Sequence, residues 1–419
     1  MNAERRETFT AVAGSVPSVP RQMVRIAALA CLLLAACAPA AAAAGRAGTA
    51  RALAKQMRWA GGSSGALAVD LDSGRMLYSL RSGTRRMPAS VQKLYTSVAA
   101  LRRLGPTGRL STSVLAEQEP DTTGVVHGDL YLRGSGDPNF DALDANSLAQ
   151  QVADAGIVSV TGRVRGDESA FDARRGVPSS GFALTSEVGV LSALTFNRGR
   201  SGRGSPYWQR RPARFAAAAF SEQLRGLGVT VRRRASTGVT PDDAELVTEW
   251  RSLAVSELLR QMNPPSDNFM AETLVKVLGA RFGGAGSTEA GTGVVRDTLA
   301  GFDVAPQVID GSGLSRYDRT SPREVVKMLE EMDGDASFTG SLAIAGRTGT
   351  LAGRMRGGAA RDRCRAKTGT LRDVSALAGY CTTRGGGNVA FAFLMNYVSP
   401  YGARILQDRM TNALARYTP

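Results

Sequence analysis

Residues 88–104 read Pro-Ala-Ser-Val-Gln-Lys-Leu-Tyr-Thr-Ser-Val-Ala-Ala-Leu-Arg-Arg-Leu, an apolar-periodic stretch that predicts a helix from about Ala89 or Ser90. Gly105-Pro106 ends it. The stretch contains the motif S-x-x-K, and residues three apart share a helix face, so Lys93 is expected to stand over Ser90. Burial lowers the pKa of a lysine, so Lys93 is a candidate base for the Ser90 proton. The plainer alternative is a surface lysine whose alkyl chain covers apolar neighbours.

Two further short motifs follow in order along the chain. Ser266-Asp267-Asn268 is an S-x-N, and Lys367-Thr368-Gly369 is a K-T-G. Each motif is weak alone, but their joint occurrence in this order is strong support for nucleophilic serine chemistry. Asp267 is expected to begin or cap a helix.

The composition excludes several other chemistries. The chain has 419 residues, 43% of them hydrophobic and 21% charged, with one histidine and four cysteines. A His-rich or four-thiolate metal site therefore has too few ligands, and a Ser-His-Asp triad would have to use His127. We expect no metal and no cofactor. His127 itself reads as an exposed residue at a strand end.

Longer segments around these motifs carry a resemblance to a known family. The three motifs are typical of the penicillin-recognising serine enzymes, and the surrounding segments resemble the D-alanyl-D-alanine carboxypeptidase/endopeptidase family of the penicillin-binding-protein-4 type. The resemblance covers the chain from about Ala66 to Tyr397. The segments are Asp129–Pro138 (DLYLRGSGDP), Ser192–Asn197 (SALTFN), Ser266–Glu272 (SDNFMAE), Asp310–Arg316 (DGSGLSR) and Arg365–Thr370 (RAKTGT). Tyr317-Asp318 departs from the asparagine often found after the DGSGLSR segment.

The resemblance implies a role for each motif residue. Ser90 would attack the carbonyl between two D-alanines, with Lys93 as its base. Ser266 would relay a proton to the leaving amine, and Asn268 would orient Lys93 and the substrate amide. The K-T-G strand would bind the substrate. Lys367 and Thr368 would hold the terminal carboxylate, Gly369 would let the substrate lie along the strand, and the backbone N–H groups of Ser90 and Thr370 would form the oxyanion hole.

The fold class expected is α/β (α+β): a β-lactamase/transpeptidase-like domain with a central antiparallel sheet flanked by helices. The body is assigned to residues 45–106 and 206–419. Residues 107–205, with short β-like runs separated by Gly, Asp and Pro, are assigned to a mostly β inserted domain.

Two cysteines lie in this body, and we predict a disulfide between them. A hairpin centred on Arg372-Asp373 would set Cys364 directly opposite Cys381, within reach of a bond. Such a bond persists in exported proteins. The alternative is a pair of small buried core residues.

The amino terminus predicts export. Residues 1–44 read as a signal peptide, with an apolar run from Ile26 to Ala44 behind two arginines, and Met23 is a possible true start. Leu34-Ala-Ala-Cys37 also resembles a bacterial lipobox, so either a lipid on Cys37, with a membrane tether, or simple cleavage within Ala40–Ala44 remains open. The expected location is the periplasmic or extracellular cell-wall space.

The charge of the chain leaves its partners open. The formal net charge of +15 fits either an anionic surface such as a wall polymer or membrane, or an Arg-rich genome. No nucleic-acid signature is present. The family implies peptidoglycan stem peptides as substrates and β-lactams as inhibitors. Two other functions stay open: a β-lactamase or esterase on the same scaffold, and a non-catalytic cell-wall-binding protein.

Overall fold

The computed structural model describes residues 45–202 and 204–419. The predicted signal peptide, with the alternative start Met23 and the lipobox residue Cys37, lies outside the described residues. In the part of the chain that is described, no helix is both long and apolar enough to cross a membrane.

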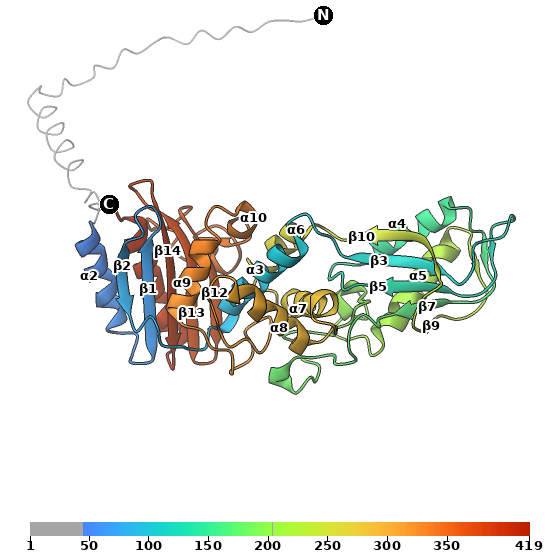
Figure 1. Ribbon diagram of the computed structural model, residues 1–419, viewed down its shortest axis with the longest axis horizontal. Helices are drawn as coiled ribbons and strands as arrows, with labels where there is room; N and C mark the ends of the chain where they lie inside the picture. Colours follow the sequence, from blue (N-terminus) through green and yellow to red (C-terminus); the bar gives the residue numbers. More distant parts are fainter. Residues whose placement is uncertain (1–44, 203) are drawn as a thin grey trace, which may run out of the picture. The chain divides into compact units, whose positions relative to one another are not determined.

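A six-stranded antiparallel sheet forms the centre of the catalytic body (Figure 1). Its order is β11-β12-β13-β14-β1-β2, so strands from the two ends of the sequence pair at β14 and β1. This is the central antiparallel sheet that the sequence predicts. The strands are β1 (Ser64–Asp70), β2 (Met76–Leu80), β11 (Ala343–Ile344), β12 (Cys364–Leu371), β13 (Val374–Thr382) and β14 (Asn388–Asn396).

Helices cover both faces of this sheet. Along β14, Ala390, Ala392 and Leu394 belong to one core, while Phe391 and Phe393 alternate with them into another. Both faces are thus buried, which explains why the strand is apolar at nearly every position. The first core holds α3 (Lys93–Leu104), α6 (Val255–Met262), α7 (Asn268–Phe282), α8 (Thr288–Ala300), α9 (Pro322–Glu331) and the short α10 (Ala336–Thr339); the second holds α2 (Arg46–Met57) and α11 (Pro400–Ala415).

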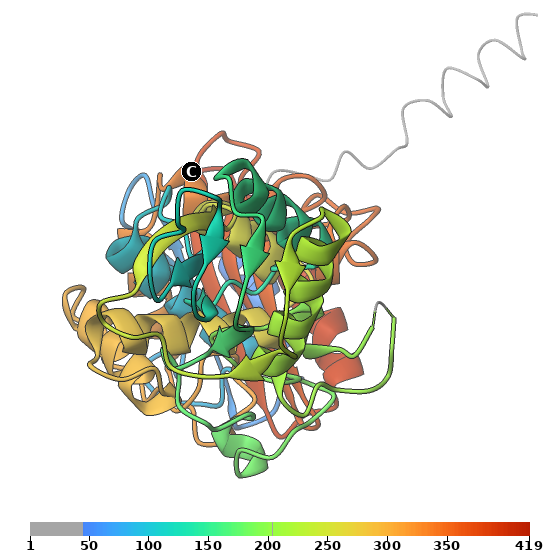
Figure 2. The same ribbon diagram turned by 90° about the vertical axis from the view of Figure 1, so that its right-hand side faces the viewer.

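A second region has its own sheets and core (Figure 2). Five strands pair in the order β10-β3-β5-β7-β9 and three in the order β4-β6-β8, and two helices pack against them. The elements are β3 (Ser111–Ala116), β4 (Val125–Val126), β5 (Leu130–Gly134), α4 (Ala142–Asp154), β6 (Ser159–Val160), β7 (Val164–Asp167), α5 (Pro212–Gly226), β8 (Thr230–Val231), β9 (Ser236–Thr237) and β10 (Glu245–Arg251). We call residues 107–251 the insert.

The predicted end of the inserted domain at residue 205 disagrees with this pairing. Strands β8 and β10 lie beyond residue 205, yet β8 pairs with β6 and β10 pairs with β3. The Arg- and Gly-rich stretch before α5 resembles a domain boundary in its composition alone. The chain then returns to the same sheets, which is a long-range pairing that local composition does not reveal.

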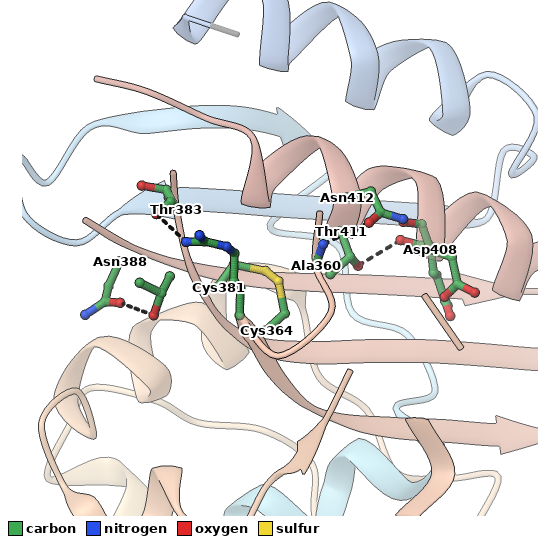
Figure 3. The surroundings of a disulfide bond; sticks show 11 residues. Ala360, Cys364, Cys381, Thr383, Asn388, Asp408, Thr411 and Asn412 are labelled. Atoms are coloured by element: carbon green, nitrogen blue, oxygen red, sulfur yellow. Dashed lines mark hydrogen bonds between the residues drawn. A yellow bond between two sulfur atoms is a disulfide. The ribbon is translucent and has the colours of Figure 1, made fainter. Parts of the chain in front are cut away.

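The hairpin of β12 and β13 turns at Arg372-Asp373, and its register sets Cys364 opposite Cys381. The two sulfur atoms are bonded in a disulfide (Figure 3). Both cysteines are fully buried in the core that packs under α11.

Candidate active site

Ser90 and Lys93 lie where one short helical turn becomes a longer helix. The turn Ala89–Gln92 (η1) is a 3-10 helix, and α3 begins at Lys93. The Lys93 Nζ donates a hydrogen bond of 3.0 Å to the Ser90 Oγ. Its side chain is completely buried, so the alternative of a surface lysine is wrong.

Lys93 has two further acceptors, both from segments distant in the sequence. The Nζ donates to Asn268 Oδ1 at 2.7 Å and to the carbonyl oxygen of Ser312 at 2.7 Å. Three acceptors match the three donors of an ammonium group. The side-chain nitrogen of Asn268 in turn donates to the backbone oxygen of Glu187, at 3.1 Å, which connects this cluster to the insert.

The S-x-N segment is held at the start of α7. Asp267 caps the helix, as predicted, because its carboxylate accepts from the Met270 backbone N–H at 2.9 Å. Ser266 has a φ of 66°, a left-handed conformation that is uncommon outside glycine. Backbone strain of this kind is often found at functional sites. It turns the chain so that Ser266 and Asn268 border the same small pocket.

The K-T-G residues lie on β12 beside the serine turn. Lys367 is fully buried and donates to the Thr368 carbonyl at 2.9 Å, while the Thr368 hydroxyl donates to Thr350 Oγ1 at 2.8 Å. The Thr370 hydroxyl is exposed and accepts from the Arg404 guanidinium at 3.2 Å. Burial lowers the pKa of Lys367 well below its usual value, and the Lys93 charge adds to this.

Gly369 also has a packing role in the protein itself. A Cβ at this position would lie 2.5 Å from the Pro88 carbonyl oxygen and 3.1 Å from the Ser90 backbone nitrogen. Glycine is therefore required for β12 to approach the serine turn, whatever it does for a substrate. Gly313 closes the other side, since a Cβ there would lie 1.9 Å from the Ala89 carbonyl oxygen.

A cluster of three buried carboxyl groups supports Lys93, and sequence reasoning missed it. Glu272 Oε1 accepts from the backbone N–H of Ser312 at 2.8 Å, which fixes the peptide whose carbonyl holds Lys93. Asp310 accepts from the Gly313 N–H at 2.6 Å, and Asp318 accepts from the backbone N–H of Ile309 at 2.7 Å. Glu272 follows Asn268 by four residues on one helix. This spacing puts both side chains on the same helix face and could have indicated that Glu272 lies near Lys93.

The Asp310 carboxylate organises the loop that follows it, because it accepts from the backbone N–H groups of Ser312, Gly313 and Ser315. Its burial beside Lys93 is what the sequence does not show. Tyr317 is exposed, and Asp318, the other residue of the departing pair, is buried.

Burial sets the protonation behaviour of this centre. It lowers the pKa of Lys93 to about 8, against the opposing attraction of Asp310 and Glu272. Burial also raises the pKa of Glu272 to about 8, with Asp310 adding to the effect. The lysine and the glutamate therefore change protonation over the same pH range, and Lys93 becomes a usable base slightly above neutrality.

His127 lies far from this chemistry, exposed in the insert and paired with Asp121 at 2.8 Å. Across the described ranges 45–202 and 204–419, no group of three His, Cys, Asp or Glu residues is placed to hold a metal ion.

A buried lysine between a serine and the asparagine of a second motif, flanked by a K-T-G strand, defines a penicillin-recognising serine enzyme. The model of the D-Ala-D-Ala carboxypeptidase 3 (S13) family matches residues 47–183 and 203–417. The chain belongs to this family of serine-type D-Ala-D-Ala carboxypeptidases, as the sequence predicts.

Individual relatives agree with the family. The chain is 32% identical to a D-alanyl-D-alanine carboxypeptidase of Actinomadura sp. (strain R39), over 85% of this chain and 82% of the relative. It is 30% identical to carboxypeptidase DacB of Mycolicibacterium smegmatis, over 80% and 76% of the two chains. The crystal structure of penicillin binding protein 4 (dacB) of Haemophilus influenzae shares the fold, with a TM-score of 0.75 at 21% identity over 87% of this chain and 99% of that one. That protein is also known in complex with a β-lactam.

Proposed function

We propose that this enzyme cleaves D-Ala-D-Ala bonds in peptidoglycan stem peptides or their cross-links, through an acyl-enzyme on Ser90. The observation that carries the proposal is the position of the Lys93 Nζ, 3.0 Å from the Ser90 Oγ and 2.7 Å from Asn268 Oδ1. A nucleophile within hydrogen-bond reach of a base, with a third group orienting that base, is the arrangement that activates a serine.

The reaction then proceeds in two steps. Neutral Lys93 takes the proton of the Ser90 hydroxyl, and the Oγ attacks the carbonyl carbon between the two D-alanines. The C–N bond breaks, the terminal D-alanine leaves as an amine that receives a proton through Ser266, and an ester remains on Ser90. Water hydrolyses this ester, returns the hydroxyl to Ser90 and releases the shortened peptide as a carboxylic acid.

Substrate binding is assigned to the K-T-G strand. Lys367 and Thr368 hold the terminal carboxylate, a match of positive charge and hydroxyl donor. The N–H groups of Ser90 and Thr370 stabilise the oxyanion. The close approach of β12 to the serine turn at Gly369 supports this assignment, because it keeps these two residues on one wall of the site.

The same proposal covers location and inhibitors. The disulfide between Cys364 and Cys381 fits an oxidising compartment, which supports export to the cell-wall space. A β-lactam presents a strained amide in place of the D-Ala-D-Ala bond and is expected to acylate Ser90 covalently.

Labelling with a fluorescent penicillin tests the mechanism, with Ser90→Ala as the matched control. The wild-type enzyme is expected to carry one covalent label and Ser90→Ala none. A label that persists on Ser90→Ala contradicts the assignment of the nucleophile. Absence of any label on the folded wild-type enzyme favours a non-catalytic wall-binding protein.

A second assay separates the enzymatic alternatives. The proposal predicts release of D-alanine from a free pentapeptide or cleavage of a cross-linked dimer, together with a slowly released penicillin adduct. Rapid turnover of penicillin without peptide cleavage points to a β-lactamase instead.

A further inference from the structure

One arginine of α11 reaches the K-T-G strand from outside the catalytic cluster. Arg404 lies in the second turn of α11, and its side chain is exposed. Its Nη2 donates a hydrogen bond of 3.2 Å to the Thr370 hydroxyl on β12. Among the described residues no carboxylate forms an ion pair with Arg404, and Asp408, one helical turn further on, pairs with Arg354 at 2.7 Å. The charge of Arg404 is therefore available to a ligand.

Three threonine hydroxyls lie beside this guanidinium, and we call them the threonine row. Thr368 and Thr370 are two residues apart on β12, so their side chains share one face of the strand, roughly 7 Å from each other. The Thr368 hydroxyl donates to Thr350 Oγ1 at 2.8 Å. Thr350 is exposed and belongs to the 3-10 turn Gly349–Leu351 (η4). The row thus offers hydroxyl donors along one line that ends at the arginine.

The threonine row lies along the edge of the catalytic centre. Gly369 separates its two residues on β12, and a Cβ at Gly369 would lie 3.1 Å from the Ser90 backbone nitrogen. At the other end, the Thr350 backbone N–H donates to the carbonyl oxygen of Pro264 at 2.9 Å. Pro264 is two residues before Ser266. A ligand group on the row therefore lies between the S-x-N segment and the nucleophile turn.

The row needs a source of positive charge if it is to hold an anion. Successive side chains of a strand alternate between its faces, so Lys367 lies on the opposite face of β12 from Thr368. Lys367 is fully buried, and its Nζ donates to the carbonyl oxygen of Thr368. Burial lowers the pKa of this lysine well below its usual value. An exposed arginine stays protonated and offers paired N–H donors that match a carboxylate, so Arg404 is the stronger source of charge at this edge.

We propose that Arg404 is a specificity-determining residue, whose guanidinium binds the terminal carboxylate of the substrate together with the threonine row. The inference rests on the proposed function and extends it, since Lys367 and Thr368 keep their assignment and Arg404 and Thr350 join them. The guanidinium donates to one carboxylate oxygen and the hydroxyls donate to the other. A peptide whose C-terminus is an amide carries no negative charge there, so the site discriminates against it.

Two pentapeptides that differ only at the C-terminus test the proposal. One ends in D-alanine with a free carboxylate, and the other ends in D-alanine amide. Arg404→Ala is expected to raise KM for the acid about tenfold, as fits the loss of a hydrogen bond to a charged group, with kcat and the constants for the amide within about twofold. Arg404→Lys is expected to lose only about threefold, because it keeps the charge but not the paired donors. An equal rise in KM for both peptides would overturn the proposal.

Two further variants separate this site from general effects of charge. Arg409→Ala removes an equal charge from an exposed position on the same helix and is expected to leave both KM values within about twofold. If Arg409→Ala weakened the acid as much as Arg404→Ala does, net charge would explain the effect and the proposal would be wrong. Thr350→Val removes one hydroxyl of the row and is expected to raise KM for the acid about threefold. Thermal unfolding checks that each variant is folded.

Binding without catalysis distinguishes this inference from the proposed function. If the wild-type protein neither takes a penicillin label nor cleaves either peptide, the proposed function fails. Calorimetric titration of Ser90→Ala with the acid and the amide still measures recognition of the carboxylate. Adding Arg404→Ala to Ser90→Ala is expected to weaken binding of the acid about tenfold and to leave the amide unchanged. Absence of any preference for the acid in Ser90→Ala, or a preference that survives Arg404→Ala in full, would overturn the inference.

Discussion

The charged side chains of the catalytic centre and those of the insert differ in the partners that hold them. In the centre, Lys93, Lys367, Glu272 and Asp310 are completely buried. The insert also buries carboxylates such as Asp167, but its ion pairs are direct and partly exposed. Examples are His127 with Asp121, whose side chains are 58% and 36% exposed, and Arg165 with Asp129.

The difference lies in what holds each charge. In the part of the chain that the structure describes, no ion pair involves Lys93, Glu272 or Asp310; Lys93 donates to a hydroxyl, an amide oxygen and a carbonyl, and Glu272 accepts from backbone N–H groups. A direct ion pair would stabilise the charged lysine and raise its pKa. Lys93 instead has neutral hydrogen-bond partners, and the carboxylates lie behind them. Its pKa therefore stays low enough for the lysine to lose its proton near neutral pH.

The most severe test of this comparison removes the lysine itself. Lys93→Met keeps a similar volume but has no base, so penicillin acylation is expected to fall about 10³-fold, within the range typical of general-base catalysis. Stopped-flow or label-incorporation kinetics measure the rate, and thermal unfolding confirms that the variant is folded.

Lys276→Met is the matched control. Lys276 is also fully buried, on α7, but it pairs directly with Asp172 of the insert at 2.5 Å. This variant is expected to lose stability, because Asp172 loses its partner, and to acylate within a few-fold of the wild-type rate. A loss of acylation equal to that of Lys93→Met would contradict the separate roles of the two lysines.

The disulfide gives the next largest effect, and it acts on the catalytic sheet alone because the insert contains no cysteine. Cys364→Ala with Cys381→Ala is expected to lower the free energy of unfolding by about 3 kcal/mol, the loop-closure value for a short loop. Denaturant unfolding measures it. Acylation of the folded variant by penicillin is expected to be unchanged, since Lys367 and Thr368 keep their strand pairing with β13.

Replacing one glycine in each region by alanine compares how well the two regions tolerate an added Cβ. Gly369→Ala would place a Cβ 2.5 Å from the Pro88 carbonyl oxygen and is expected to cost about 1–3 kcal/mol of stability, as overpacking does, with slower acylation. Gly226→Ala, at the end of α5 in the insert, meets nothing within 4 Å and is expected to be neutral or slightly stabilising. Equal costs in thermal unfolding would show that the close approach of β12 to the serine turn is not specially constrained.

Local sequence signals predicted the catalytic sheet well. The β12–β13 hairpin was predicted to turn at Arg372-Asp373, and the structure turns there, with β12 ending at Leu371 and β13 beginning at Val374. The start of α7 was likewise predicted, from Asp267 as a helix cap. These features depend on neighbours in the sequence, so periodicity and turn chemistry are enough to find them.

What the sequence did not predict depends on contacts between distant segments. The insert extends to β10 because Trp250 pairs with Thr112, a contact that no local pattern records. Glu272 and Asp310 were visible as residues, but their meeting under Lys93 requires α7 and the loop after residue 309 to converge.

The smallest expected effect is the most specific to the catalytic centre, and it concerns Glu272. Burial raises the pKa of Glu272 to about 8, so its carboxyl is mainly neutral at pH 6–7 and Gln is a close mimic there. Above pH 8 the glutamate becomes charged, which raises the pKa of Lys93 and keeps that lysine protonated. Glu272→Gln is therefore expected to acylate like the wild-type enzyme at pH 6–7 and about two- to fivefold faster near pH 8–9, as fits a charge interaction screened by the protein.

The stability of the same variant has a matching pH dependence. A carboxyl whose pKa is raised on folding contributes stability below its unfolded value, near 4.5, and loses it as the pH rises through the folded value of about 8. Glu272→Gln should thus gain stability relative to the wild-type protein between these limits. Asp167→Asn in the insert is the control. Burial raises the pKa of Asp167, but hydrogen bonds from Thr240 and Ser169 lower it further, so the pKa lies below its usual value. The pH dependence of stability that Asp167 contributes is therefore expected only in acid. A uniform loss of acylation by Glu272→Gln at every pH would mean that Glu272 only positions the Ser312 peptide and does not titrate with Lys93.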